Sequence, residues 1–195
     1  TYEGVDEKFK IKNSISEIEK IINKYKIKKP FVVYTGSLYP HKNVERLVKA
    51  VKRFNVLRHK NKKIMLVIVC GRNIFYERFK KKIKQMKAKN FVNLVGFVPD
   101  KDLTAIYQQA EAFVFPSLWE GFGLPGLEAM ALGLPVVCSE SSCLPEIYGK
   151  AALYFNPLDV KEIAEKIKMI IENKELRENL IKEGFKQVKK YSWEK

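Results

Sequence analysis

The chain has 195 residues, of which 46% are hydrophobic, so it can bury the core of one large domain or of two small ones. No apolar run is long enough to span a bilayer, and the two histidines, His41 and His59, lie so far apart in the sequence that a zinc site has almost no support. The net charge of +15 is compatible with nucleic acid, an anionic membrane surface or an anionic substrate as partner, but we favour a lysine-rich solvated surface for most of it.

The chain opens on Thr1 and on polar sequence, and it carries no signal peptide. We therefore expect a piece of a longer protein. Its three cysteines, Cys70, Cys138 and Cys143, form no C-x-x-C pair and are predicted to be buried, reduced thiols. Reduced thiols are typical of the cytoplasm, which is the location we expect.

Six short apolar runs, at 31–36, 64–70, 91–95, 112–115, 135–138 and 152–155, alternate with amphipathic helical patterns. This alternation predicts an α/β fold with a doubly wound parallel sheet of about six strands, similar to a Rossmann fold. We divide the chain into residues 1–30, an entry segment with one helix, and residues 31–195, the sheet domain. Asn43, Asp100 and Asp159 are candidate N-caps of the helices that follow them.

The rest of the chain is organised around residues 119–128. An apolar strand precedes this stretch and a helix begins within it, so it forms a loop at the carboxyl end of a strand, where open α/β sheets bind ligands. Gly121 and Gly123 lack Cβ, so their backbone can adopt positive φ and approach a ligand closely. Pro125 suits the first helical turn, and the free N–H groups of that turn suit a phosphate.

Two glutamates, Glu120 and Glu128, flank this loop with seven residues between them. We expect Glu120 to be exposed, and both carboxylates to accept hydrogen bonds from sugar or ribose hydroxyls. With this spacing and its glycine and proline placement, the run from 113 to 137 resembles the signature of retaining GT-B glycosyltransferases, in particular glycosyltransferase family four. A looser resemblance covers nearly all of residues 31–188. It implies the carboxyl-terminal, donor-binding half of a GT-B fold, a nucleotide-diphosphate sugar as substrate, no metal or other cofactor, and retention at the anomeric carbon.

The resemblance also implies roles for individual residues. Glu120 is expected to be the catalytic residue at the transferred sugar, Glu128 to hold the ribose and Lys42 to bind the diphosphate. Ser37 stands where the family commonly has an arginine, a departure that weakens phosphate binding or passes it to backbone N–H groups or to Arg72. The other expected contacts are made to the sugar and diphosphate by Gly36, Gly121, Phe122, Gly123 and Leu124, and to the base by Phe97, Val98 and Leu103.

Residues 3–6 and 37–43 resemble segments of mannosyltransferases of polysaccharide assembly. They favour GDP-mannose as donor, with UDP-sugars close behind, and a glycan or lipid-linked acceptor bound through an amino-terminal domain absent from this sequence. Peripheral association with the inner face of the membrane is a further expectation, and no nucleic acid partner is expected.

Other interpretations of the central loop stay open at this point. Gly121, Gly123 and Gly126 also spell G-x-G-x-x-G, the fingerprint of NAD-type oxidoreductases, but that fingerprint belongs to the first strand of its domain and three strand-like runs come first here. A tight strand–helix turn alone explains Gly126 and Gly133. A non-enzymatic nucleotide- or nucleic-acid-binding module is another alternative. A glycosidase also uses two carboxylates, but it has no use for a diphosphate-binding loop.

Overall fold

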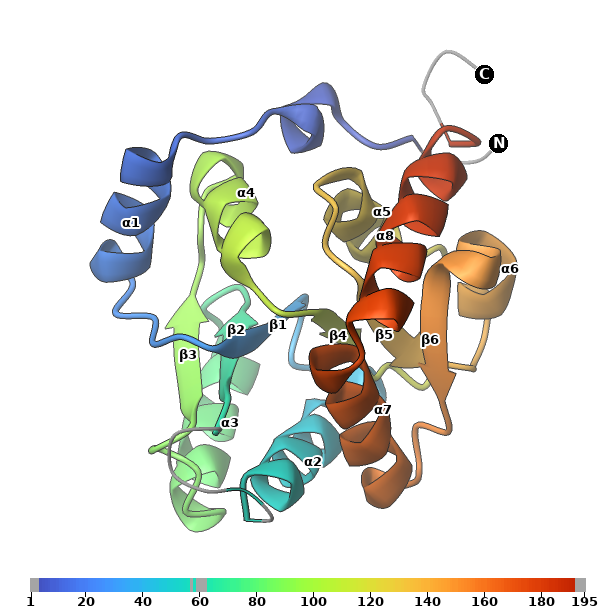
Figure 1. Cartoon of the computed structure of the whole chain (residues 1–195). Coiled ribbons are helices and arrows are strands. Elements are labelled where there is room, and N and C mark those ends of the chain that lie inside the picture. The colour runs from blue at the N-terminus through green and yellow to red at the C-terminus, as the bar shows by residue number, and fades with distance from the viewer. Residues whose placement is uncertain (1–3, 57, 59–62, 192–195) are drawn as a thin grey trace.

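Six parallel strands form one sheet in the order β3-β2-β1-β4-β5-β6 (Figure 1). The strands are β1 (Phe31–Thr35), β2 (Met65–Val69), β3 (Val92–Gly96), β4 (Phe113–Phe115), β5 (Val136–Ser139) and β6 (Ala152–Phe155). The structure, a computed structural model, describes residues 4–56, 58 and 63–191. The predicted doubly wound, Rossmann-like sheet is therefore confirmed.

Helices cover both faces of the sheet (Figure 1). One layer contains α2 (Val44–Val56), α3 (Ile74–Gln85) and α7 (Val160–Glu172), and the other contains α1 (Ile15–Lys24), α4 (Asp100–Gln109), α5 (Leu124–Ala131) and α8 (Lys174–Val188). The short α6 (Leu144–Tyr148) lies beside β6, and the 3-10 helices are η1 (Glu7–Lys10), η2 (Pro40–Lys42) and η4 (Gly149–Ala151).

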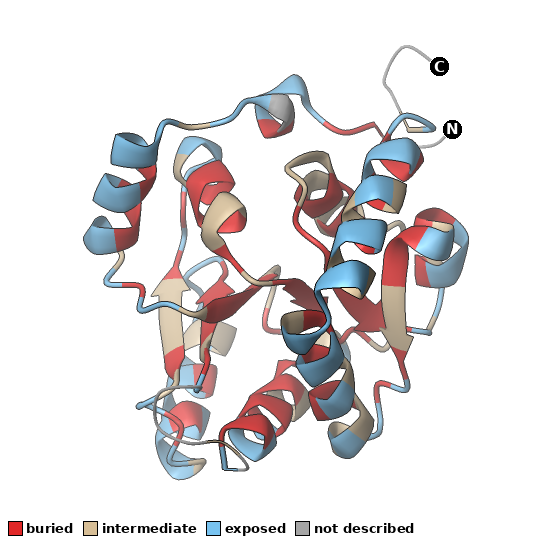
Figure 2. Cartoon of the chain, in the orientation of Figure 1, coloured by how far each residue is buried: buried red, intermediate tan, exposed pale blue. Residues whose placement is uncertain are grey.

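The strands read as unbroken apolar runs because helices cover both of their faces. Residues 31–34 in β1 and 113–115 in β4 are buried, and Figure 2 shows the buried residues concentrated in the central strands and on the inner sides of the helices. The apolar stripe of α2, which includes Leu47, Val48 and Val51, packs into the same core. Hydrophobic periodicity along the chain therefore accounts for both layers.

The candidate caps had different outcomes. Asp159 caps α7, where its carboxylate accepts from the backbone N–H groups of Lys161 and Glu162, as predicted. Asp100 is not an N-cap, because Pro99 occupies that position and Asp100 lies in the first turn of α4. Asn43 directly precedes α2, but its backbone is left-handed, with φ of 59°, and its side chain bonds to other loops.

The segment before the first strand packs against the sheet domain. The helix α1 lies on α4, where Lys24 and Tyr25 both donate to the Asp102 carboxylate at 2.6 Å. The preceding η1 contacts α4 and α5. This segment therefore reaches the helices that follow β3 and β4. Glu3 of the mannosyltransferase-like segment and His59 lie outside the described residues.

The cysteines are free thiols, and two of them match the prediction. Cys70 and Cys138 are buried, and burial raises the pKa of the Cys70 thiol to about 12. Cys143 is only half-buried, so the prediction of a buried thiol was wrong there, because it precedes α6 on a loop at the rim of the sheet. Among the described residues, no helix has both the length and the apolar character needed to cross a bilayer.

Candidate functional site

The strand order reverses between β1 and β4, which are neighbours in the sheet. Chain connections leave in opposite directions from such a point, so the carboxyl ends of the two strands open a crevice where α/β proteins bind ligands. The loops at 36–43 and 116–123 border this crevice. They are joined by a backbone hydrogen bond from Leu118 to the His41 carbonyl, 2.8 Å long.

Asn43 also holds the rim of the crevice together. Its buried side-chain amide donates to the carbonyls of Pro116 at 2.9 Å and Pro157 at 2.8 Å, while its Oδ1 accepts from Arg46. Asn43 thus ties the loops after β1, β4 and β6 to one another. From the sequence it was assigned only as a helix cap, since bonds to residues so distant in the chain leave no local signal.

Lys42 and Glu120 meet across the crevice. The Lys42 Nζ lies 2.7 Å from both carboxylate oxygens of Glu120. The side chains are 18% and 9% exposed, so the expectation of an exposed Glu120 was wrong: the ion pair and the surrounding loops cover it. The residue assigned to the diphosphate and the residue assigned to the sugar are therefore in direct contact.

The loop after β5 holds the backbone of Glu120 in place. Ser142, itself in the left-handed region with φ of 61°, donates its hydroxyl to the Glu120 carbonyl at 2.7 Å and accepts from the Glu120 N–H at 3.3 Å. Cys143 Sγ donates to the same carbonyl at 3.4 Å. The sequence predicted a polar loop here, but only the pairing of β4 with β5 brings it next to Glu120.

The loop after β1 folds back over its own strand. The Tyr34 hydroxyl donates to the Ser37 carbonyl at 2.6 Å. Gly36 has φ of 149°, and a Cβ there would lie 2.8 Å from that hydroxyl oxygen, so this position requires glycine. Ser37 is half-buried, and its backbone stabilises the loop from which Lys42 projects.

The glycines of the central loop serve different purposes. Gly123 is the N-cap of α5 with φ of 94° and provides no side-chain cap, and Leu124 and Pro125 open the helix. Pro125 has no N–H and the Gly126 N–H donates to the Gly123 carbonyl at 3.1 Å, which leaves the Leu124 N–H of the first turn for a ligand. Gly121 is exposed and does not have positive φ. Gly126 packs against Tyr148, whose hydroxyl donates to the Gly123 carbonyl. Gly126 thus has a packing role, and the G-x-G-x-x-G run follows β4, not the first strand of the sheet.

Glu128 lies on the first turns of α5, half-buried and beside charges from two other segments. Burial raises the pKa of its carboxyl to about 7, the negative charge of Asp100 adds to this rise, and the Lys8 ammonium opposes it. Lys8 pairs with Asp100 at 2.7 Å and with Asp6 at 2.9 Å. No described residue forms a hydrogen bond or an ion pair with the Glu128 carboxylate, so its oxygens are available to a ligand hydroxyl. The sequence contained no signal for these neighbours.

Of the residues expected near a base, Phe97 and Val98 lie on the loop after β3 and Leu103 lies in α4. Phe97 is 69% exposed, whereas Val98 and Leu103 are buried. Arg72 is exposed, and its Nε would lie 2.7 Å from a Cβ added to Gly96, so this side chain lies against the end of β3. Phe122 is half-buried and packs edge-on against Tyr191, 5.6 Å between centroids.

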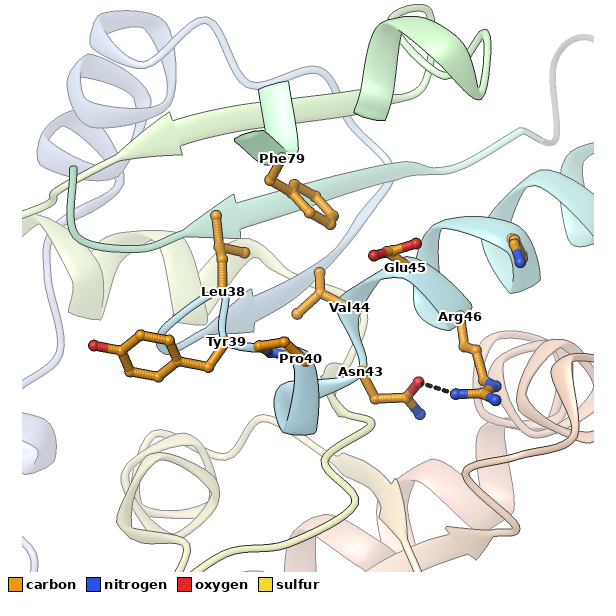
Figure 3. Close-up of a pocket in the computed structure, with 9 residues that line it drawn as sticks. Leu38, Tyr39, Pro40, Asn43, Val44, Glu45, Arg46 and Phe79 are labelled. Atoms are coloured by element: carbon orange, nitrogen blue, oxygen red, sulfur yellow. Dashed lines mark hydrogen bonds between the residues drawn. The ribbon is translucent and has the colours of Figure 1, made fainter. Parts of the chain in front are cut away.

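A separate hollow of about 280 Å³ opens on the outer side of the loop after β1 (Figure 3). Leu38 and Phe79 form its apolar wall, and Glu45, Arg46 and Lys49 line its polar side. Lys42 and Glu120 do not line it. This hollow is therefore distinct from the crevice.

Comparison with known proteins gives, for most of the chain, the family that the sequence motif resembles. The family described as "Glycosyl transferases group 1" matches residues 17–187. The chain is 34% identical over 186 residues to O-antigen chain mannosyltransferase B of Escherichia coli, covering 94% of this chain and 48% of the relative. It thus spans about half the length of that relative.

Two solved structures share the fold. The carboxyl-terminal domain of a group 1 glycosyl transferase from Francisella tularensis superposes with a TM-score of 0.77 at 23% identity, covering 96% of this chain and 97% of that domain. Anabaena Alr3699/HepE, in complex with UDP and glucose, superposes with a TM-score of 0.81 at 21% identity, covering 97% of this chain and 51% of that protein.

Proposed function

The chain belongs to the glycosyl transferases of group 1, and from this premise we propose that it is the donor-binding half of a retaining mannosyltransferase that uses GDP-mannose. A UDP-sugar is the second candidate donor, since the similar Anabaena protein was solved with UDP and glucose. The observation that supports the proposal best is the meeting of Lys42 with Glu120 at the switch point of the sheet.

Lys42 and Glu120 each have a role when a donor is bound. The ammonium of Lys42 turns from Glu120 to the diphosphate, where it offsets the negative charge that grows on the leaving group. The Leu124 N–H at the start of α5 donates to the same anion. Glu120, released from Lys42, accepts from hydroxyls of the transferred sugar.

The nucleoside is held by the neighbouring elements. Glu128 accepts from the ribose hydroxyls, and Phe97 provides an exposed ring against which the base stacks. Arg72, which follows β2, is the candidate to replace the arginine that the family commonly has where Ser37 stands. In this proposal the domain needs no metal, because Lys42 and the helix amino terminus neutralise the diphosphate.

The acceptor is proposed from the relatives, and the place of action from the free cysteines and the family resemblance. Escherichia coli mannosyltransferase B acts on the O-antigen chain, and this chain covers about half of it. By analogy we propose a glycan or lipid-linked acceptor bound by the other half of the protein, and a site of action in the cytoplasm at the inner face of the membrane.

Calorimetric titration of the 195-residue chain tests the proposal. We expect GDP to bind with a dissociation constant nearer about 1 mM than 1 μM, because the domain alone provides half of the pocket, with UDP and ADP weaker and guanosine weakest. The matched variants are Lys42→Ala, which should weaken GDP binding, and Lys49→Ala, an exposed lysine on α2 that should not. If none of the nucleoside diphosphates binds, or if both variants behave alike, the proposed site is wrong.

A further inference from the structure

The positive charge of this protein is concentrated in one part of the chain. Residues 46–99 contain 16 lysines and arginines and a single acidic residue, Glu77, so this segment has a net charge of +15, the net charge of the entire chain. The remaining residues contain 21 basic and 21 acidic side chains. A uniformly lysine-rich surface, which we favoured from composition, would not produce this division.

The segment folds into α2, β2, α3 and β3, and its two helices lie side by side in one layer (Figure 1). Lys52 on α2 donates to the Met86 carbonyl at the end of α3 at 3.0 Å, and Lys82 on α3 pairs with Glu45 on α2. Because β2 and β3 are largely covered, the charges gather on the outer surfaces of these helices and on the turns that follow them.

We call this surface the basic face, and we define it by its exposed members: Lys49, Lys52, Arg53, Lys63, Arg78, Lys80, Lys81, Lys84, Lys87 and Lys89. Among the described residues, none of these ten takes part in an ion pair, whereas Lys82 and Arg58 beside them do. Such a concentration of unneutralised charge opposes folding by self-repulsion, so an anionic partner that binds it relieves that cost.

The basic face is indented and partly apolar. The hollow with Arg46 and Lys49 on its rim lies at the start of α2 (Figure 3). A second hollow of about 280 Å³ lies at the far end of the same helix, with Lys52, Lys63 and Lys87 around Phe91. Val56, 74% exposed, borders the second hollow.

We propose that the basic face docks the protein on a membrane rich in anionic phospholipids. Eleven of the 16 basic residues are lysines. A lysine acts as a point charge, which suits a diffuse anionic surface, whereas bidentate binding of a single phosphate favours arginine. Nucleic acid fits less well, since the exposed rings of Phe97, Trp119 and Phe185 lie at the carboxyl edge of the sheet or on α8. Tyr39, which lines the first hollow, already packs edge-on against Phe75.

The position of the face suits this docking. It covers one helical layer, whereas the crevice opens at the carboxyl edge of the sheet, so a membrane against α2 and α3 leaves the crevice free. This inference rests on the proposed site of action at the membrane and deepens it by assigning the surface that binds the lipids, and its test involves no donor. The isolated chain is suitable for the test because the similar Francisella domain crystallised alone.

The test is co-sedimentation with vesicles of phosphatidylcholine, with and without phosphatidylglycerol, at low and at high salt. We expect binding only with phosphatidylglycerol and loss of that binding at high salt. The patch variant is K49E/K81E/K84E and the matched control is K20E/K150E/K182E, which makes the same change in net charge on exposed lysines of α1, η4 and α8. At about fivefold per lysine, the patch variant should bind at least roughly 100-fold more weakly than the parent, and more weakly than the control.

Three results would overturn the proposal. These are no binding of the parent to phosphatidylglycerol vesicles, an equal loss in both variants, and tighter binding of the parent to a short DNA duplex than to the vesicles at the same salt. Thermal unfolding of both variants checks that they fold. A failure to bind vesicles together with normal GDP binding would reject the membrane surface and leave the donor site standing.

Discussion

Replacing Glu128 by Gln should stabilise the fold and weaken nucleotide binding at once. The Glu128 carboxyl has a pKa of about 7 in the folded chain against an ordinary value of 4.5, chiefly because it is buried. Below pH 4.5 it is protonated whether the chain is folded or unfolded, so it costs nothing. Between pH 4.5 and about 7 the carboxyl ionises in the unfolded chain but stays protonated in the folded one, so the folded protein loses stability over that window, and the loss is complete above about pH 7.

The size of the effect follows from the same values. A rise from 4.5 to about 7 corresponds to at most roughly 3.5 kcal/mol, at about 1.4 kcal/mol per pH unit. Because water reaches part of this side chain, we expect Glu128→Gln to gain about 1–2 kcal/mol of stability at pH 8. Loss of a hydrogen bond from the ribose to a charged acceptor should cost about 1–3 kcal/mol of nucleotide affinity.

Urea unfolding at pH 5 and pH 8, with calorimetric titration of GDP at pH 8, measures both quantities. The stability gained by Glu128→Gln should appear at pH 8 and shrink toward pH 5. The control is Glu165→Gln, an exposed residue on α7 that should change neither quantity. A variant that is less stable than the parent at pH 8, or that binds GDP equally well, would refute the reasoning.

Three further variants test other parts of the site. Lys42→Ala should weaken GDP binding far more than guanosine binding in calorimetry, and an equal loss of both would make Lys42 a surface residue. Glu120→Gln should bind GDP several-fold more tightly, because Lys42 is then free of its partner, while transfer by the two-domain protein should fall at least about 100-fold in a radiolabelled donor assay; unchanged GDP affinity would show that the pair does not restrain Lys42. Gly126→Ala should lose about 1–3 kcal/mol of stability in urea unfolding, since its Cβ would overlap the Tyr148 ring; parent-like stability would mean that the ring moves aside.

Much of the candidate site could be predicted because it is local in the chain. The loop from Trp119 to Glu128 contains the glycines and the proline that its turn requires. In the structure Gly123 has positive φ and Pro125 lies in the first turn of α5, as expected. The resemblance singled out Lys42 and Glu120, and the structure brings these two residues together. The assigned donor contacts themselves stay predictions until a nucleotide is bound.

The errors came from positions whose environment is set by distant segments. Asp100 looked like a cap, but α4 begins one residue earlier than the sequence suggested, and its carboxylate pairs with Lys8 from the amino-terminal segment. Cys143 was expected to be buried, yet it lies on the rim where it supports Glu120.

The six strands, the helices between them and the family could be predicted from the sequence, because apolar periodicity, glycine placement and motif spacing involve only a few neighbouring residues. The strand order, and with it the crevice between β1 and β4, is known only from the folded chain. Only the folded structure shows that Lys42 and Glu120, 78 positions apart, neutralise each other. The approach of Lys8 and Asp100 to Glu128 is likewise visible only there. Burial and Coulomb energies depend on distance in space, so the charge states of this site follow only once the chain has folded.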